Sequence, residues 1–463
     1  MPRARLSVLV GVTAATIGVI YGYDQGSIAA ALLSLKGDFH LGTGAQQLVT
    51  TSVVAGQIVG ALLGGRLANA IGRQKTMVGV AIGFAVFAVL CGIAPNEGFL
   101  VGARFLLGVT IGISILAAPL FIAESAATSV RGALLVTYQV ATITGIAVAY
   151  FVGVALASGG HWRLMLGLSA IAGAAIAVLI ARLPDTPRWY LMRGRRDEAR
   201  AVLERAGYSR VDAELDLIEE DLRHEERGTF RELFSAPFTK AGAFVLGFGF
   251  LVQITGINGI VYYTPTMLKD VGFKTDTDAI LGAALVQLAG LAVTIAAIWL
   301  IDRWGRRPVL LTGLGVMVVA NAVLVAAFAA GQSTALSLIG ILLFVIGFNF
   351  GFGVTVWAYS SESLPARLRS VGASVLLGAN LTANLIIGLE FLTLFNALGG
   401  TALFAIFGGL SLVAIAFVAR LAPETKGREL EEIRAYWLND ASWPEPRTGR
   451  FARDGERVPT ETR

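Results

Sequence analysis

Asp24 and Arg104 are oppositely charged side chains that lie inside long apolar stretches of the sequence. An ionisable residue within a membrane-spanning segment is costly, and it marks a functional site by default. Burial favours the neutral form of a carboxyl group, whereas a neighbouring guanidinium favours the charged form. Making and breaking this ion pair would therefore load and release a proton. The alternative is a static ion pair that only helps the helices to assemble.

Several amide and aromatic side chains also lie within apolar stretches. An amide offers a donor and an acceptor together, which suits a ligand with many hydroxyl groups. A tryptophan adds a flat apolar face and an N–H donor. We therefore predict a binding site formed by Gln139, Gln253, Asn258, Trp357 and Asn380. Tyr262, followed by Tyr263 near the outer end of the same stretch, could gate this site. Taken singly, each amide could instead hold two helices together.

The composition indicates an integral membrane protein. Of the 463 residues, 55% are hydrophobic and 15% are charged, and the mean hydropathy is +0.69. In soluble domains about a quarter of the residues are charged. The 55 glycines suit close contact between helices in lipid. The net charge of +5 arises from the basic connections between spans and an arginine-rich tail, so we predict no nucleic-acid partner.

The apolar residues form twelve blocks, and a block of about 20 residues crosses the hydrocarbon core of a bilayer. We predict an all-α membrane protein whose spans cover residues 6–34, 46–69, 76–94, 98–122, 133–157, 163–183, 240–268, 279–301, 308–330, 334–361, 370–393 and 400–420. The first block exceeds the about 7–15 apolar residues of a signal peptide. We expect it to remain as an uncleaved helix.

Basic residues accumulate in alternate connections between these spans. One set of connections holds Arg66, Arg73, Lys75, Arg131, Arg303, Arg306, Arg307, Arg367 and Arg369. The other set holds only Lys36, Arg163, Lys269 and Lys274. Because basic connections stay on the cytoplasmic side, we expect both termini in the cytoplasm and the protein in the inner (plasma) membrane.

The chain divides into four parts. Residues 6–185 and 239–421 each hold six spans, and residues 186–238 form a charged linker between them. Apolar residues recur in the linker at near-helical spacing, which predicts short amphipathic helices at the cytoplasmic face. A disordered charged linker is the alternative. Residues 422–463 form a cytoplasmic tail, which we expect to be disordered from about Asp440 onward.

Three motifs recur in the same order in both halves, after corresponding spans. Gly64–Lys75 corresponds to Ile301–Pro308, and Pro184–Arg188 corresponds to Pro423–Gly427. The third pair consists of Glu124-Ser125 with Arg131-Gly132 and of Glu362-Ser363 with Arg369-Ser370. An even number of spans per half makes the halves parallel repeats, as in the major facilitator superfamily.

At these residues the sequence resembles the sugar porter family of that superfamily, from residue 6 to about residue 436. The glycine- and arginine-rich loops resemble the superfamily signature. The family is further suggested by Gly22-Tyr23-Asp24, Arg104-x-x-x-Gly108-x-x-x-Gly112, and the motifs at 184–189, 253–263 and 423–433. The resemblance implies a proton-coupled importer of a monosaccharide or polyol, working by alternating access. It also implies that Asp24 and Arg104 couple the proton and that the amides, Tyr262 and Trp357 bind the sugar.

Charged residues at corresponding helix ends predict a gate on the cytoplasmic side. Such charges could hold the halves together while the outer side is open, and the resemblance implies the same role. The gate residues are Arg73, Glu124, Arg131, Asp302, Arg306, Arg307, Glu362 and Arg369. Topology-setting charge alone would explain the arginines, but it would not explain the matched glutamates. Asn69 stands where the superfamily often has Asp, which puts an ion pair at that position in doubt.

Some residues depart from the family pattern. Val252 and Leu381 stand where the family often has Gln and Trp, and Val354 stands where a proline is usual. A hydroxyl contact and a ring contact are therefore expected to be missing, and the usual hexose is not assumed. An uncoupled facilitator and a proton-coupled exporter remain as alternatives.

A membrane enzyme or sensor is the third class to consider. The histidines, His40, His161 and His224, are scattered, and Cys91 is the single cysteine, so no metal-ligand cluster is expected. No Walker-type phosphate loop occurs in the sequence. We predict no enzymatic activity and no cofactor, with the proton as coupling ion. The expected partners are the solute, the proton and the lipid bilayer, and we expect a monomer.

Overall fold

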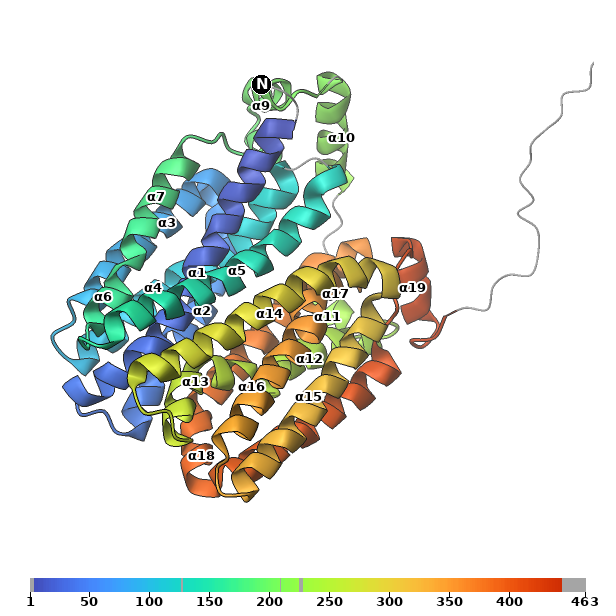
Figure 1. Ribbon diagram of the computed structural model, residues 1–463. Helices are drawn as coiled ribbons and strands as arrows, with labels where there is room; N and C mark the ends of the chain where they lie inside the picture. The colour runs from blue at the N-terminus through green and yellow to red at the C-terminus, as the bar shows by residue number, and fades with distance from the viewer. Residues whose placement is uncertain (1–3, 126–127, 209, 225–227, 444–463) are drawn as a thin grey trace, which may run out of the picture.

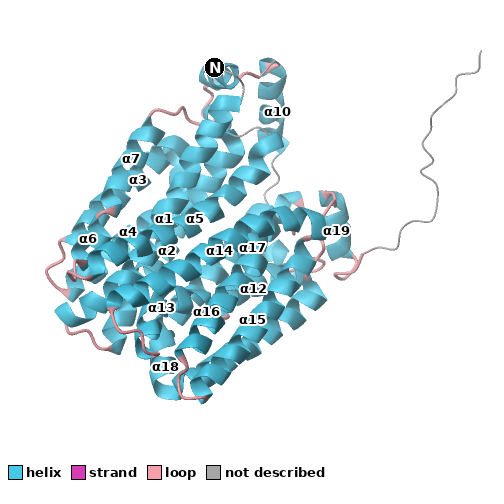
Figure 2. Cartoon of the chain, in the orientation of Figure 1, coloured by secondary structure: helices cyan, strands magenta, loops and turns pink. Residues whose placement is uncertain are grey.

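The computed structural model describes residues 4–125, 128–208, 210–224 and 228–443. Within these ranges every regular element is a helix, and no strand occurs (Figure 2). The last twenty residues of the predicted disordered tail, 444–463, lie outside the described residues.

The first half consists of five long helices and one bent span. The helices are α1 (Ala4–Asp38), α2 (Thr43–Ile71), α3 (Arg73–Gly92), α4 (Glu97–Ser125), α5 (Thr128–Ala157), α6 (Trp162–Gly167) and α7 (Ser169–Ala181). Four shorter helices follow between the halves: α8 (Pro187–Met192), α9 (Arg196–Ala206), α10 (Val211–His224) and α11 (Phe230–Leu233). The side chain of Thr186 caps α8 by accepting a hydrogen bond from the Trp189 N–H.

The second half repeats this order with more breaks. Its helices are α12 (Thr239–Ile254), α13 (Ile257–Asp270), α14 (Asp276–Trp304), α15 (Arg306–Ala329), α16 (Thr334–Phe348), a π-helical turn (Asn349–Gly353), α17 (Val354–Glu362), a 3₁₀ turn (Ala366–Leu368), α18 (Arg369–Leu421) and α19 (Leu430–Leu438). Gly256 separates α12 from α13 in a left-handed conformation (φ 105°). Gly399 (φ 78°, ψ 162°) divides α18 at the boundary between the last two predicted spans.

Ten helical segments of the described chain are long and apolar enough to cross a membrane. One of them, Ala366–Leu421, contains two predicted spans on either side of Gly399. Together with α1, these segments account for all twelve predicted spans, because each predicted span lies on one helix or on consecutive helical elements.

Glycines bring α1 and α5 into backbone contact. Gly18, Gly22 and Gly26 are spaced four residues apart and share one side of α1. A Cβ atom on Gly22 would lie 1.8 Å from the Thr142 carbonyl oxygen, and one on Gly18 would lie 2.6 Å from the Tyr138 carbonyl oxygen. Only glycine permits this approach, so α1 and α5 are held together as one unit.

The two halves lie side by side, with α9, α10 and α19 at one end of the molecule (Figure 1). We call this end the linker face and the other end the opposite face. At the opposite face, hydrogen bonds join the halves. The Thr393 hydroxyl donates to Gln47 Oε1 at 2.9 Å, and Asn396 Nδ2 donates to Thr43 Oγ1 at 3.2 Å. Nearer the middle, the Tyr150 hydroxyl donates to the Val261 carbonyl at 2.6 Å.

Candidate functional site

Asp24 on α1 and Arg104 on α4 form an ion pair in the middle of the first half, as their types and positions predict. Arg104 Nη1 lies 3.0 Å from Asp24 Oδ1, and the two residues are 1% and 4% exposed. The same guanidinium donates from Nε to the Val49 carbonyl at 2.7 Å and from Nη2 to the Thr50 carbonyl at 3.4 Å. Arg104 therefore keeps two backbone partners on α2 whether or not the Asp24 carboxyl group is charged.

A cavity of about 670 Å³ lies between the two halves. It is lined at mid-height by residues of α1, α5, α12, α14 and α18, and it continues to the linker face, where Ser361, Arg367 and Ser370 line it. The cavity is thus open toward the linker face, whereas the hydrogen bonds of the opposite face close the other end.

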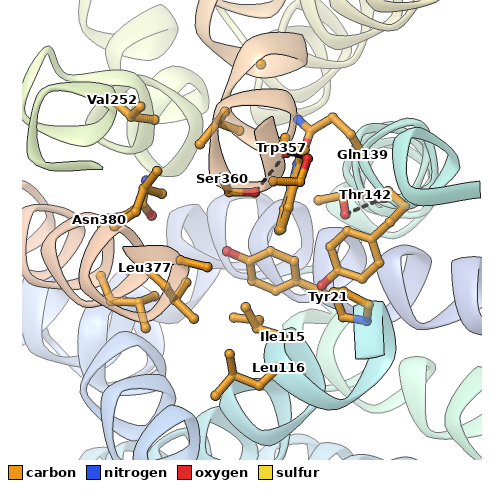
Figure 3. A pocket seen from close by; sticks show the side chains of 18 of the residues that line it. Tyr21, Ile115, Leu116, Gln139, Thr142, Val252, Trp357, Ser360, Leu377 and Asn380 are labelled. Atoms are coloured by element: carbon orange, nitrogen blue, oxygen red, sulfur yellow. Dashed lines mark hydrogen bonds between the residues drawn. The ribbon is translucent and has the colours of Figure 1, made fainter. Parts of the chain in front are cut away.

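Five predicted binding residues line this one cavity: Gln139, Gln253, Asn258, Trp357 and Asn380. Trp357 Nε1 donates to Gln139 Oε1 at 3.0 Å, which links α17 to α5 (Figure 3). Gln253 Nε2 donates to Asn380 Oδ1 at 3.3 Å, which links α12 to α18. These bonds fix the side chains while leaving the Gln139 and Asn380 amino groups available to a ligand. The Gln253 Oε1 atom is buried and has no hydrogen-bond partner among the described residues.

Tyr262, the sixth predicted binding residue, does not line the cavity in this conformation. It lies on α13, is fully buried, and has its ring edge near Gly388, where Thr51 of the first half also packs against α18. The neighbouring Tyr263 hydroxyl donates to the Gly388 carbonyl at 3.0 Å. Tyr262 therefore belongs to the closed part of the molecule, between the cavity and the opposite face.

Several cavity residues were not predicted from the sequence. They are Tyr21, Gln25, Tyr138, Thr142, Gln287 and Asn349. Gln287 and Asn349 are polar residues within apolar spans, so the criterion that found Gln253 could have found them. Tyr21 and Gln25 lie one helical turn apart on α1 and flank Asp24, which is a second usable signal. Tyr138 precedes Gln139, but an aromatic residue in an apolar span is indistinguishable from ordinary core.

The departures at Val252 and Leu381 fall within the site. Both side chains line the cavity and are buried, next to the hydrogen-bonded pair of Gln253 and Asn380. Val252 and Leu377 stand on either side of Asn380 in Figure 3. This part of the wall offers apolar groups to a ligand.

Two similar ion-pair networks lie at the linker face, one in each half. In the first half, Arg73 Nε lies 2.9 Å from Glu124 Oε2, and the Thr186 hydroxyl donates to the same oxygen at 2.6 Å. In the second half, Arg306 Nε lies 3.0 Å from Glu362 Oε2, and the Thr425 hydroxyl donates to it at 2.7 Å. The predicted proximity of arginine and glutamate is therefore present, and each network stays within its own half.

Acidic residues complete both networks at helix N-termini. The Asp185 carboxylate accepts hydrogen bonds from the backbone N–H groups of Arg73 and Gln74 at the start of α3. The Glu424 carboxylate accepts them from Arg306 and Arg307 at the start of α15, both at 3.0 Å. These carboxylates face the positive ends of helix dipoles. Burial nevertheless raises the pKa of Asp185, although the backbone N–H donors and Arg73 counteract this effect.

The remaining predicted gate residues are placed as follows. Asp302 lies 3.3 Å from Arg306 Nη1, and the Arg307 guanidinium donates to the Ala419 carbonyl. Arg369 lines the cavity near the linker face, and its Nε atom has no hydrogen-bond partner among the described residues. The side chain of Arg131 lies outside the described residues. The Asn69 side chain is not part of the Arg73–Glu124 pair, although its carbonyl accepts a hydrogen bond from Trp189 Nε1 at 3.2 Å.

The chain is similar in sequence to known transporters over nearly its whole length. The chain is 33% identical to the galactose-proton symporter of Escherichia coli (strain K12) over 428 residues, which are 91% of this chain and 92% of that protein. It is 32% identical to the arabinose-proton symporter of the same strain over 440 residues, 93% of each protein. It is 31% identical to the major myo-inositol transporter IolT of Bacillus subtilis (strain 168), covering 90% of this chain and 92% of that protein.

Solved structures share the fold. The xylose transporter XylE from E. coli, in a partially occluded inward-open conformation, matches with a TM-score of 0.81 at 23% identity. The match covers 92% of this chain and all of that chain. Its inward-open form gives the same TM-score at 24% identity and covers 93% of this chain. The predicted all-α fold, with twelve spans in two six-helix halves, is confirmed.

The family described as "Sugar (and other) transporter" matches residues 10–437. This range contains the two halves except for the first residues of α1, together with the linker, both linker-face networks and every cavity residue named above. Both the family match and the relatives agree with the resemblance that the sequence motifs gave. This multi-pass membrane protein belongs to the sugar (and other) transporter family.

Proposed function

We propose that the protein imports a monosaccharide or polyol together with a proton, by alternating access of one central cavity. The observation that carries this proposal is the placement of five amide and indole residues around a single cavity, beside the buried Asp24–Arg104 pair. Amides pair with hydroxyl groups as donors and acceptors at once. The named substrates of the relatives, galactose, arabinose and myo-inositol, are all polyhydroxylated.

The linker face is assigned to the cytoplasm in this proposal. The connections rich in arginine and lysine lie at this face, and such connections are retained on the cytoplasmic side. The conformation is then inward-open, with the outer entrance closed by the hydrogen bonds of the opposite face. Both termini are cytoplasmic, and the protein resides in the inner (plasma) membrane as a monomer.

The proton is carried by Asp24. A charged Asp24 is held by Arg104, and a proton on the carboxyl group ends the electrostatic attraction between α1 and α4. Arg104 then remains attached to the Val49 and Thr50 carbonyls of α2. Because α1 is locked to α5 by glycines, a shift of α1 also moves Gln139 in the cavity wall. Protonation and solute binding are coupled through this shared unit, and no cofactor takes part.

Alternating access requires the two faces to open in turn. The two linker-face networks attach the segments Pro184–Arg188 and Pro423–Gly427 to their own halves. Each half therefore moves as a rigid body, and its charged end forms one side of the gate. Tyr262 occupies the closed path between the cavity and the opposite face, which supports a role in outer gating. When the outer side opens, its ring becomes accessible to an arriving solute.

The decisive experiment uses the full-length protein in liposomes. A panel of labelled pentoses, hexoses and polyols is offered with and without an inwardly directed proton gradient. We expect accumulation of at least one solute only with the gradient, and its abolition by a protonophore. Equal equilibration with and without the gradient would establish an uncoupled facilitator. A panel without any uptake or binding would refute the proposed solute class.

A further inference from the structure

Tyr138 on α5 carries a hydroxyl group that the function described so far does not use. The residue lines the cavity, its side chain is 2% exposed, and its hydroxyl has no hydrogen-bond partner among the described residues. A buried hydroxyl without a partner is destabilising, because it has lost its hydrogen bonds to water.

Four other buried tyrosines of the described chain avoid this cost by donating to a backbone carbonyl. Tyr23 donates to Met165, Tyr150 to Val261, Tyr263 to Gly388 and Tyr359 to Pro423. Buried tyrosines are expected to find such partners. Tyr138 differs from these four in lining the cavity. Its hydroxyl oxygen is covered in this conformation, so a bound solute supplies the partner only after the neighbouring side chains move aside.

The position of the Tyr138 ring is fixed from two sides. Its backbone lies against Gly18 of α1, with no room for a larger residue. Its ring packs edge to face on Trp357 of the second half, with the ring centres 5.5 Å apart. Trp357 is itself hydrogen-bonded to Gln139, the next residue after Tyr138. The hydroxyl is therefore presented by a rigid support, as a binding group should be.

We propose that the Tyr138 hydroxyl binds one hydroxyl group of the transported solute. This inference rests on the proposed function and adds a ligand from the first half of the molecule. The unpaired Gln253 Oε1 on the second half requires a donor, and a second solute hydroxyl provides it. A solute held by Tyr138 and Gln253 bridges the two halves. The affinity for the solute then depends on the relative position of the two halves.

The test is Tyr138→Phe in the purified full-length protein, combined with deoxy analogues of a solute that the wild type transports. The parent solute should bind the variant about fivefold to tenfold more weakly, the range expected for one net hydrogen bond. The analogue that lacks the contacted hydroxyl should bind the variant and the wild type equally. The other analogues should lose the same factor as the parent.

Thermal unfolding separates binding from a structural role. Removing an unpaired buried hydroxyl should leave the unfolding temperature of Tyr138→Phe without ligand unchanged or raise it. The matched control is Tyr359→Phe, which deletes a paired hydroxyl outside the cavity and should lower that temperature. Equal affinity of wild type and Tyr138→Phe for the parent solute overturns the proposal, and so does an equal loss for every analogue. If the wild type binds no polyhydroxylated solute, the proposed function itself has failed.

Discussion

The indole N–H of Trp357 donates a hydrogen bond to the side-chain oxygen of Gln139 over 3.0 Å, and this bond joins the two halves in the middle of the cavity. Both residues are predicted solute ligands. Each therefore has a partner from the other half before a solute arrives. A solute that replaces this bond exchanges one partner for another and leaves neither group unpaired.

Trp357→Phe removes this bond while retaining most of the aromatic surface. We expect solute affinity to fall by about threefold to tenfold, as for the loss of one net hydrogen bond. Trp357→Ala should weaken binding further, because it also removes the ring face. Titration of the purified variants checks both, with the unfolding temperature as a control for folding. Unchanged uptake kinetics in Trp357→Ala would remove this residue from the site.

Asp24→Asn keeps the size of the side chain but removes its charge and its proton. We expect proton-driven accumulation to be lost, while exchange of labelled for unlabelled solute across the membrane persists. Loss of the buried ion pair should lower the unfolding temperature, but Arg104 retains the Val49 and Thr50 carbonyls, so the variant should still fold. Both assays are made in the same proteoliposome preparation. Full accumulation by the variant would contradict the assignment of Asp24 as the proton carrier.

The two linker-face glutamates allow a matched comparison. The Glu124 side chain is 7% exposed, and that of Glu362 is 37% exposed. Breaking a buried ion pair is more destabilising than breaking a hydrated one. Glu124→Gln should therefore lower the unfolding temperature more than Glu362→Gln, and both variants should change the transport rate more than solute affinity. If Glu362→Gln lowered the unfolding temperature more than Glu124→Gln, burial would not determine how much each network contributes to stability.

Gly22→Ala tests the contact between α1 and α5. Its new Cβ would lie 1.8 Å from the Thr142 carbonyl oxygen, so the helices must separate, at a cost of about 1–3 kcal/mol for overpacking. Gly102→Ala on α4 is the control, because no heavy atom lies within 4 Å of its new Cβ. We expect a lower unfolding temperature and slower proton-coupled uptake for Gly22→Ala alone. Equal behaviour of the two variants would argue against a rigid α1–α5 unit.

Much of the site was predictable because lipid makes polar side chains conspicuous. Asp24 and Arg104 stand out against apolar neighbours, and their opposite charges inside two spans predict that they pair. The same contrast identifies Gln139, Gln253 and Asn380, since a buried amide needs a partner or a ligand. The hydrogen bonds between these residues, however, depend on the orientation of four different helices.

Other features depend on packing that no local pattern encodes. Tyr138 resembles core in sequence, and only its place in the cavity wall and its unpaired hydroxyl distinguish it from Tyr150. The π-helical turn at Asn349–Gly353 places Trp357 one residue out of α-helical phase with α16. Nothing in the amino-acid composition of this segment predicts the turn. The open face is likewise not predictable from the sequence, because one sequence must serve both conformations.

The placement of the charge pairs affects the free-energy difference between the two conformations of the transport cycle. Since the Arg73–Glu124 and Arg306–Glu362 pairs each remain within one half, separation of the halves at the linker face leaves these charges paired. At the opposite face, opening must break neutral hydrogen bonds such as those of Gln47 and Thr43, each with a net value of about 1 kcal/mol. The two conformations can then be nearly balanced, since about 2 kcal/mol for these two bonds is well within the roughly 5.5 kcal/mol that reverses a 1:99 population. A single proton and a single solute molecule are sufficient to tip such a balance.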